Sequence, residues 1–249
     1  MINKRIYNYL IFVSMENLQK NDEKELLEEQ SFFSKRLQRR SFLQYAGAGA
    51  AGIALVAAGC KKNKNDDEPQ SGVYFGSGDV AILNYAYALE QLEAAFYTKV
   101  IMSQYSGITS AETALLTDIR DHEVAHREFF KLALGANAIS ALEVDFSSID
   151  FGSRTSVLAS AKAFEDLGVS AYNGAGFLIK SPVYLTLAGK IVSVEARHAA
   201  LIRDLISPGT FADNLTENAL DKELLPPAVL AIAGQYIKTK INVSDLPTS

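Results

Sequence analysis

Beyond about residue 78, apolar residues recur every three or four positions, the spacing that places them on one face of an α-helix. This pattern predicts four long helices and a shorter fifth one. The predicted ranges are about 78–104, 110–134, 154–175 and 182–206, with the fifth at about 226–239. The sequence therefore predicts an all-α protein.

Residues that favour helix ends flank these ranges. Serine and threonine are preferred just before a helix because their side-chain oxygen accepts a hydrogen bond from a free backbone N–H. The predicted starts are marked by Ser77, by Thr109 in a capping box with Glu112, by Ser153, and by Ser181 followed by Pro182. The predicted ends are marked by Gly135, by Gly174 and Gly176, and by Pro208 with Gly209.

The lengths of the connections constrain how the helices pack. Only a few residues join the first helix to the second and the third to the fourth, so each pair must form an antiparallel hairpin. Residues 135–152 join the two hairpins and are numerous enough to run the length of a bundle. A four-helix bundle of two hairpins with one long crossover is therefore expected.

The two hairpins are similar to each other in sequence. At an offset of 75 residues, the first and third helices share leucine, alanine, glutamate and tyrosine at matching positions. At an offset of 72, the second and fourth helices share leucine, isoleucine, glutamate and histidine. The pairs are Leu83/Leu158, Ala86/Ala161, Glu90/Glu165, Tyr97/Tyr172, Leu115/Leu187, Ile119/Ile191, Glu123/Glu195 and His126/His198.

Two of the three histidines follow a glutamate by three residues, in Glu123–His126 and Glu195–His198. Residues three apart in a helix lie on one side, one turn apart, so each pair can converge on a single point. Glu90 and Glu165 lie on otherwise apolar helix faces that would point into the bundle. Four carboxylates and two imidazoles are therefore predicted to meet in the interior.

This much buried negative charge needs compensation. An unpaired buried carboxylate costs several kcal/mol, and four close together would repel one another. Two divalent metal ions would balance four carboxylates. Protonation of the carboxylates could also remove the charge, but it explains neither the imidazoles nor their repeated spacing. Mixed oxygen and imidazole ligands suit iron or manganese, and zinc is also compatible.

One glutamate, then E-x-x-H, then the same again on four helices resembles the ferritin-like superfamily of dinuclear carboxylate proteins. The stretches "YALEQLEAAFYTKV" and "IRDHEVAHREFF" are similar to its desiccation-related members. The resemblance covers residues 78–206 and implies a metal-binding bundle in which Glu123 and Glu195 bridge both ions. The metal ligands it implies are Glu90, Glu123, His126, Glu165, Glu195 and His198.

Other polar residues lie near these positions. Glu93 follows Glu90 by one turn, but its counterpart in the repeat is Gly168, so it is expected to be an outer acid or a substitute ligand. Tyr97 and Tyr172 are expected to pack in the core, from where their hydroxyls could bond ligand carboxylates. His122 lies on a different helix face from Glu123 and is expected to be a surface residue.

The first 59 residues resemble an export signal. Arg39 and Arg40 precede an apolar run of about 15 residues, shorter than the ~20 of a membrane span, and the run ends at Cys60. The twin arginine resembles a Tat signal and "AAGC" a lipoprotein processing site, which implies lipidation of Cys60. Residues 60–77 are expected to be a flexible tether, and 78–249 the bundle domain. Translation could start at Met1 or Met15.

Composition narrows the function classes. The chain is 48% hydrophobic and 21% charged with a net charge of −5, and no basic cluster follows residue 64, so a nucleic-acid surface is not expected.

The signal predicts a lipid-anchored protein in the periplasm or on the outer membrane. The resemblance implies ferrous-iron oxidation, peroxide reduction or catalase activity. The alternative is a non-enzymatic, partner-binding bundle with a structural or empty site, and self-association stays open.

Overall fold

The computed structural model describes residues 71–213 and 218–248. The predicted export signal, the predicted lipidation site at Cys60 and most of the predicted tether lie outside these residues.

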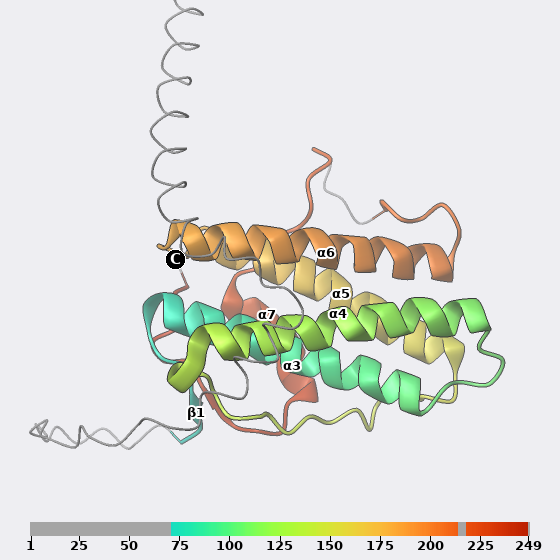
Figure 1. Cartoon of the computed structure of the whole chain (residues 1–249), viewed down its shortest axis with the longest axis horizontal. Coiled ribbons are helices and arrows are strands. Elements are labelled where there is room, and N and C mark those ends of the chain that lie inside the picture. Colours follow the sequence, from blue (N-terminus) through green and yellow to red (C-terminus); the bar gives the residue numbers. More distant parts are fainter. Residues whose placement is uncertain (1–70, 214–217, 249) are drawn as a thin grey trace, which may run out of the picture. The chain divides into compact units, whose positions relative to one another are not determined.

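Four long helices form the domain, as predicted: α3 (Gly78–Met102), α4 (Ser110–Leu134), α5 (Arg154–Gly176) and α6 (Pro182–Ile206). Helix α3 packs chiefly against α4 and α5 chiefly against α6, while α3 also contacts α5. Figure 1 shows the four helices lying alongside one another. The prediction of an all-α, four-helix bundle is confirmed. None of the helices in the described ranges is long and apolar enough to span a membrane.

The predicted helix starts are correct, and most are capped by the expected side chain. Thr109 and Glu112 form the predicted capping box, in which each side chain accepts a hydrogen bond from the other residue's backbone N–H. Ser153 and Ser181 each accept a bond from the backbone N–H three residues on. Ser77 precedes α3 but its side chain makes no capping bond. The first helix ends at Met102, two residues before the predicted end.

Helix α3 is buried on all sides through its central part, residues 81–94. The crossover between the hairpins covers the side that α4 and α5 leave free. Asn84 donates to the backbone carbonyl of Asn137 and accepts from the N–H of Ile139, and Gln91 accepts from the N–H of Leu142, each at 2.8–2.9 Å. These buried amides satisfy backbone groups that the crossover would otherwise bury without partners.

The C-terminal helix is shorter than predicted. Helix α7 (Pro226–Ala233) gives way to a 3-10 turn, η2 (Gly234–Tyr236), whereas the sequence predicted a helix to residue 239. Beyond Tyr236 the chain is extended, since Ile237 pairs with Val144 and the N–H of Lys238 donates to the carbonyl of Glu143 at 2.8 Å. Pairing with the crossover therefore competes with the helix and ends it.

The predicted tether is also too long. Strand β1 (Val73–Tyr74) pairs in parallel with β2 (Ile241–Asn242), and Phe75 is fully buried. Residues 71–77 thus belong to the folded domain, because the tail after α7 returns to pair with them. A short 3-10 turn, η1 (Gly135–Asn137), follows α4 and begins the crossover.

The segment before α7 lies directly on α5. The N–H of Leu224 donates to the carbonyl of Ser170 at 2.9 Å, and a side-chain carbon added at Gly174 would lie 2.0 Å from the carbonyl oxygen of Leu224. Only glycine allows this approach of two backbones. The glycine that sequence analysis assigned to a helix end is instead a packing position inside α5.

We expect Gly174→Ala to lower the free energy of unfolding by about 1–3 kcal/mol, because the added methyl must push the Leu224 segment away from α5. The matched control is Gly189→Ala in α6, where an added carbon meets nothing within 4 Å. That change should raise stability by about 0.5–1 kcal/mol through helix propensity. Urea unfolding of both variants measures the difference, and equal effects would contradict the packing role of Gly174.

Candidate metal centre

The six residues predicted to be ligands come from four helices and meet inside the bundle. Helices α3 and α5 each supply one glutamate, and α4 and α6 each supply a glutamate and a histidine. All four glutamates are completely buried, while the side chains of His198 and His126 are 5% and 14% exposed. The residues brought together are Glu90, Glu123, His126, Glu165, Glu195 and His198.

They form two overlapping groups that could each hold a metal ion. Within each group, one possible ligand atom from every residue lies within 4.8 Å of the others. One group consists of Glu90, Glu123, His126 and Glu195, and the other of Glu123, Glu165, Glu195 and His198. Glu123 and Glu195 belong to both.

The two shared glutamates have the geometry of bridging ligands. Glu123 places Oε2 3.7 Å from Nδ1 of His126 and Oε1 2.8 Å from Nδ1 of His198. Glu195 is closer to the other histidine: its Oε1 lies 2.9 Å from Nδ1 of His126, and its Oε2 lies 3.9 Å from Nδ1 of His198. Each carboxylate therefore directs one oxygen to each half of the site.

The two remaining glutamates each belong to one half only. Oε2 of Glu90 lies 3.5 Å from Nδ1 of His126, and Oε2 of Glu165 lies 3.5 Å from Nδ1 of His198. The repeat seen in the sequence thus produces a site with two equivalent halves.

The atoms that face the centre lack hydrogen bonds. Among the described residues, the inward oxygens of the four glutamates and Nδ1 of either histidine form no hydrogen bond, although all are buried: the imidazoles approach the carboxylates to 2.8–2.9 Å only as ion-pair contacts. Their separations of 2.8–3.9 Å resemble those of atoms around a cation, because two bonds of about 2.0–2.2 Å at right angles separate their ligand atoms by about 3 Å. The donor set therefore fits metal ions.

Two tyrosines hold the outer oxygens of the unshared glutamates. Tyr97 on α3 donates its hydroxyl to Oε1 of Glu165 on α5 at 2.5 Å. Tyr172 on α5 donates in the same way to Oε1 of Glu90 on α3. Each bond crosses from one hairpin to the other and leaves Oε2 of the glutamate directed at the centre. The expected contact between core tyrosines and the carboxylates predicted to be ligands is thus present in both halves.

Glu93 is a fifth buried carboxyl group beside the cluster. Its side chain is 4% exposed, and a carbon added at Gly168 would lie 3.0 Å from its Oε1 and 3.7 Å from Oε2 of Glu195. Gly168 is the counterpart of Glu93 in the repeat, and the side chain of Glu93 fills the space next to this glycine. Burial, reinforced by the charge of Glu195, raises the pKa of Glu93 well above its usual value.

Without metal ions, the cluster shares protons. Burial opposes a charged imidazole, but the surrounding carboxylates outweigh it and raise the pKa of His126 to about 12 and that of His198 to about 10. Burial raises the pKa of Glu90 to about 7. The pKa of Glu123 is lowered to about 2 despite burial, because both imidazoles contact it. Protons therefore balance the charge where cations are absent.

His122 was expected to be a surface residue, and it is exposed, but its ring also reaches the site. Its Nδ1 lies 2.9 Å from Nε2 of His198, within hydrogen-bonding distance. Sequence analysis missed this contact because it crosses from α4 to α6. The only signal was a third histidine directly preceding Glu123.

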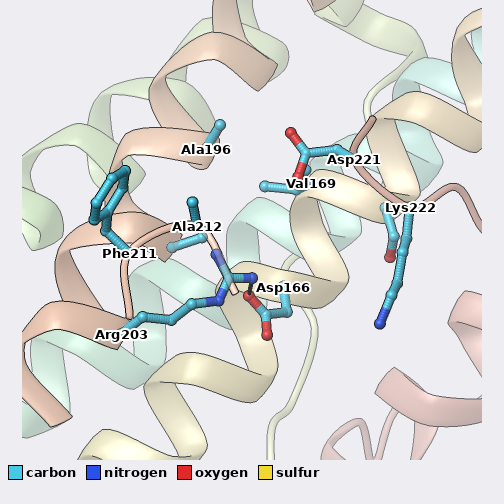
Figure 2. A pocket seen from close by; sticks show the side chains of 10 residues that line it. Asp166, Val169, Ala196, Arg203, Phe211, Ala212, Asp221 and Lys222 are labelled. Carbon is cyan, nitrogen blue, oxygen red and sulfur yellow. Dashed lines mark hydrogen bonds and ion pairs between the residues drawn. The ribbon is translucent and has the colours of Figure 1, made fainter. Parts of the chain in front are cut away.

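A separate polar cavity of about 110 Å³ lies on the other side of α5 and α6 (Figure 2). Figure 2 shows Arg203 directed at Asp166, with Phe211 on one side and Asp221 on the other. Asp166 directly follows Glu165 in the chain and therefore lies on a different face of α5 from the candidate metal ligand. The Arg203–Asp166 ion pair joins α6 to α5.

Sequence comparisons agree with this arrangement. The family model of the ferritin-like domain matches residues 78–208, which include all four long helices and every residue of the cluster. No curated protein matches the chain closely enough to count as a relative.

We expect the metal-free protein to lose thermal stability as the pH rises from about 5 to 8. Folding raises the pKa of Glu90 from 4.5 to about 7, so its stabilisation is complete below pH 4.5 and is lost as the pH rises through 7. Folding also raises both imidazole pKa values from 6.5, so their contribution declines above pH 6.5 and is lost only through about 10 for His198 and 12 for His126. Glu123 acts in the opposite direction, but only below pH 4.5.

Melting temperatures of chelator-treated protein at several pH values would measure this trend. With excess Mn²⁺ the melting temperature should instead rise with pH, because metal ligands must lose their protons before they bind. The variant Glu90→Gln should flatten the decline between pH 5 and 7. A metal-free protein whose melting temperature rises over this range would contradict the proton-sharing description.

Proposed function

This chain belongs to the ferritin-like domain family, and on that basis we propose that it binds two iron or manganese ions in the buried cluster and uses them in redox chemistry. The observation that carries this proposal is the set of buried, unpartnered oxygen and nitrogen atoms that converge in two symmetric groups. Such atoms cost free energy unless a ligand satisfies them. Oxygen and imidazole donors together favour iron or manganese.

The charge of the cluster also supports two cations. Four ionised glutamates and two neutral imidazoles balance two divalent ions, provided that the fifth carboxyl group, Glu93, stays protonated. Burial, the main cause of its raised pKa in the metal-free cluster, favours the protonated form of Glu93. Glu93 then holds a proton beside Glu195, from where it can supply one to a small molecule in the site.

The substrate class follows from the burial of the site. When bound, a pair of redox-active cations would supply two electrons to peroxide or dioxygen, and two ferrous ions that each give up one electron could replace them. The surrounding helices exclude larger molecules, and His126 is the most exposed of the six side chains at 14%. We therefore propose peroxide, dioxygen or ferrous iron as substrate, reaching the site on the His126 side. Tyr97 and Tyr172 keep the unshared carboxylates oriented throughout.

We expect protein folded in the cytoplasm and purified without chelators to carry two iron or manganese ions per chain. Glu123→Gln should reduce this to less than one, because it removes a charge and an oxygen ligand shared by both halves. The matched control is Glu128→Gln, five residues further along α4, where the glutamate contacts Arg127 and not the cluster. Elemental analysis of the three proteins measures the difference.

Peroxide consumption and ferrous-iron oxidation should then be assayed in parallel on the loaded protein. Turnover in either assay that is lost in Glu123→Gln and kept in Glu128→Gln is the expected result. A loaded protein that is inactive in both assays would support a structural metal. A stable protein that carries no metal would support the partner-binding bundle instead.

We also propose that the protein is exported and anchored to the cell envelope by a lipid on Cys60. Arg39 with Arg40, the short apolar run and the cysteine that ends it support this location. Export of a folded protein is consistent with a site that is filled before translocation. We expect Cys60→Ser to move the protein from the membrane fraction to the soluble fraction of a cell lysate, and an unchanged distribution would contradict the anchor.

A further inference from the structure

His122 and His198 face each other edge to edge. Their ring planes differ by 10° and the ring centroids are 5.1 Å apart, while Nδ1 of His122 and Nε2 of His198 are only 2.9 Å apart. The two nitrogens therefore lie between the rings, which are almost coplanar. This is the geometry of an in-line hydrogen bond rather than of face-to-face stacking.

The other nitrogen of His198 determines the direction of this bond. Nδ1 of His198 faces the carboxylates of Glu123 and Glu165, where a metal ion would take its lone pair. A neutral imidazole with Nδ1 bound to metal carries its hydrogen on Nε2. Nε2 of His198 then donates to Nδ1 of His122, which accepts.

The other half of the site lacks such a partner. The repeat offset of 72 residues pairs His126 with His198 and pairs His122 with Val194. Valine cannot accept a hydrogen bond through its side chain, and no described residue bonds Nε2 of His126. The side chain of His126 is also more exposed, 14% against 5% for His198. The pseudosymmetry of the cluster is therefore broken at the imidazoles.

We propose that His122 is a positioning residue that orients His198 and makes the metal position beside Glu165 and His198 bind more tightly than the position beside Glu90 and His126. A hydrogen bond from the outer nitrogen of a metal-bound histidine fixes the ring and increases its basicity, and both effects strengthen metal binding. This inference rests on the proposed dinuclear site. It assigns the tightly held ion to one half and the exchangeable ion to the half nearer to solvent.

Titration of the metal-free protein with Co²⁺ tests this assignment, because cobalt reports its ligands by visible absorption. The wild type should bind two ions with clearly separate affinities. His122→Ala should weaken the tighter step about 10- to 100-fold and leave the weaker step unchanged. Because His122 is exposed, the melting temperature of the metal-free variant should fall only slightly, by the effect of losing one hydrogen bond.

Two further variants separate positioning from a general effect on packing. In His122→Asn the amide oxygen can replace Nδ1 as the acceptor, so most of the tighter affinity should return. Val194→Ala alters the equivalent place in the other half and should change neither step. Equal weakening of both steps by His122→Ala, or no weakening of either, would overturn the inference while leaving the dinuclear site intact. A wild-type protein that takes up no Co²⁺ would contradict the site itself.

Discussion

The burial of four glutamates around two histidines is the constraint on which the rest of the structure depends. Charged groups in an apolar interior are tolerated only where opposite charge and directed bonds compensate for lost water. The folded chain directs eight buried nitrogen and oxygen atoms of these six residues to a common centre and gives them no hydrogen-bond partner among the described residues. Protons can balance this charge, as the raised imidazole pKa values indicate. Metal ions would balance it too and would also bind the inward-facing oxygen and nitrogen atoms, which have no hydrogen bonds.

The architecture around the cluster serves to hold these side chains in place. Each hairpin contributes one E-x-x-H pair and one single glutamate, and a tyrosine from the opposite hairpin holds the outer oxygen of that glutamate. The halves thereby depend on each other, since neither hairpin completes its half of the cluster alone. On the far side of α5, the Arg203–Asp166 pair and the segment at Leu224 support the same helices. The departures from symmetry, Glu93 opposite Gly168 and His122 opposite Val194, are where the two halves can differ in chemistry.

The sequence predicted the helices and the cluster well because both depend on local periodicity. Spacings of three and four residues placed Glu123 with His126 and Glu195 with His198, and the repeat identified Glu90 and Glu165. The contacts it did not predict are those between segments distant in the chain. Nothing near Val73 indicates that Ile241 pairs with it, and helical spacing within α4 cannot show that His122 reaches α6. The predicted end of α7 was wrong for the same reason, because pairing of the chain with the crossover overrides local helix propensity.

Anomalous diffraction from crystals of protein that was folded in the cytoplasm and never exposed to chelator tests the central claim most directly. We expect two peaks at the iron or manganese edge, about 3.5–4 Å apart. One should lie beside Glu90 and His126 and the other beside Glu165 and His198, with Glu123 and Glu195 between them. A well-ordered cluster without anomalous density, in which the imidazoles donate directly to the carboxylates, would contradict it.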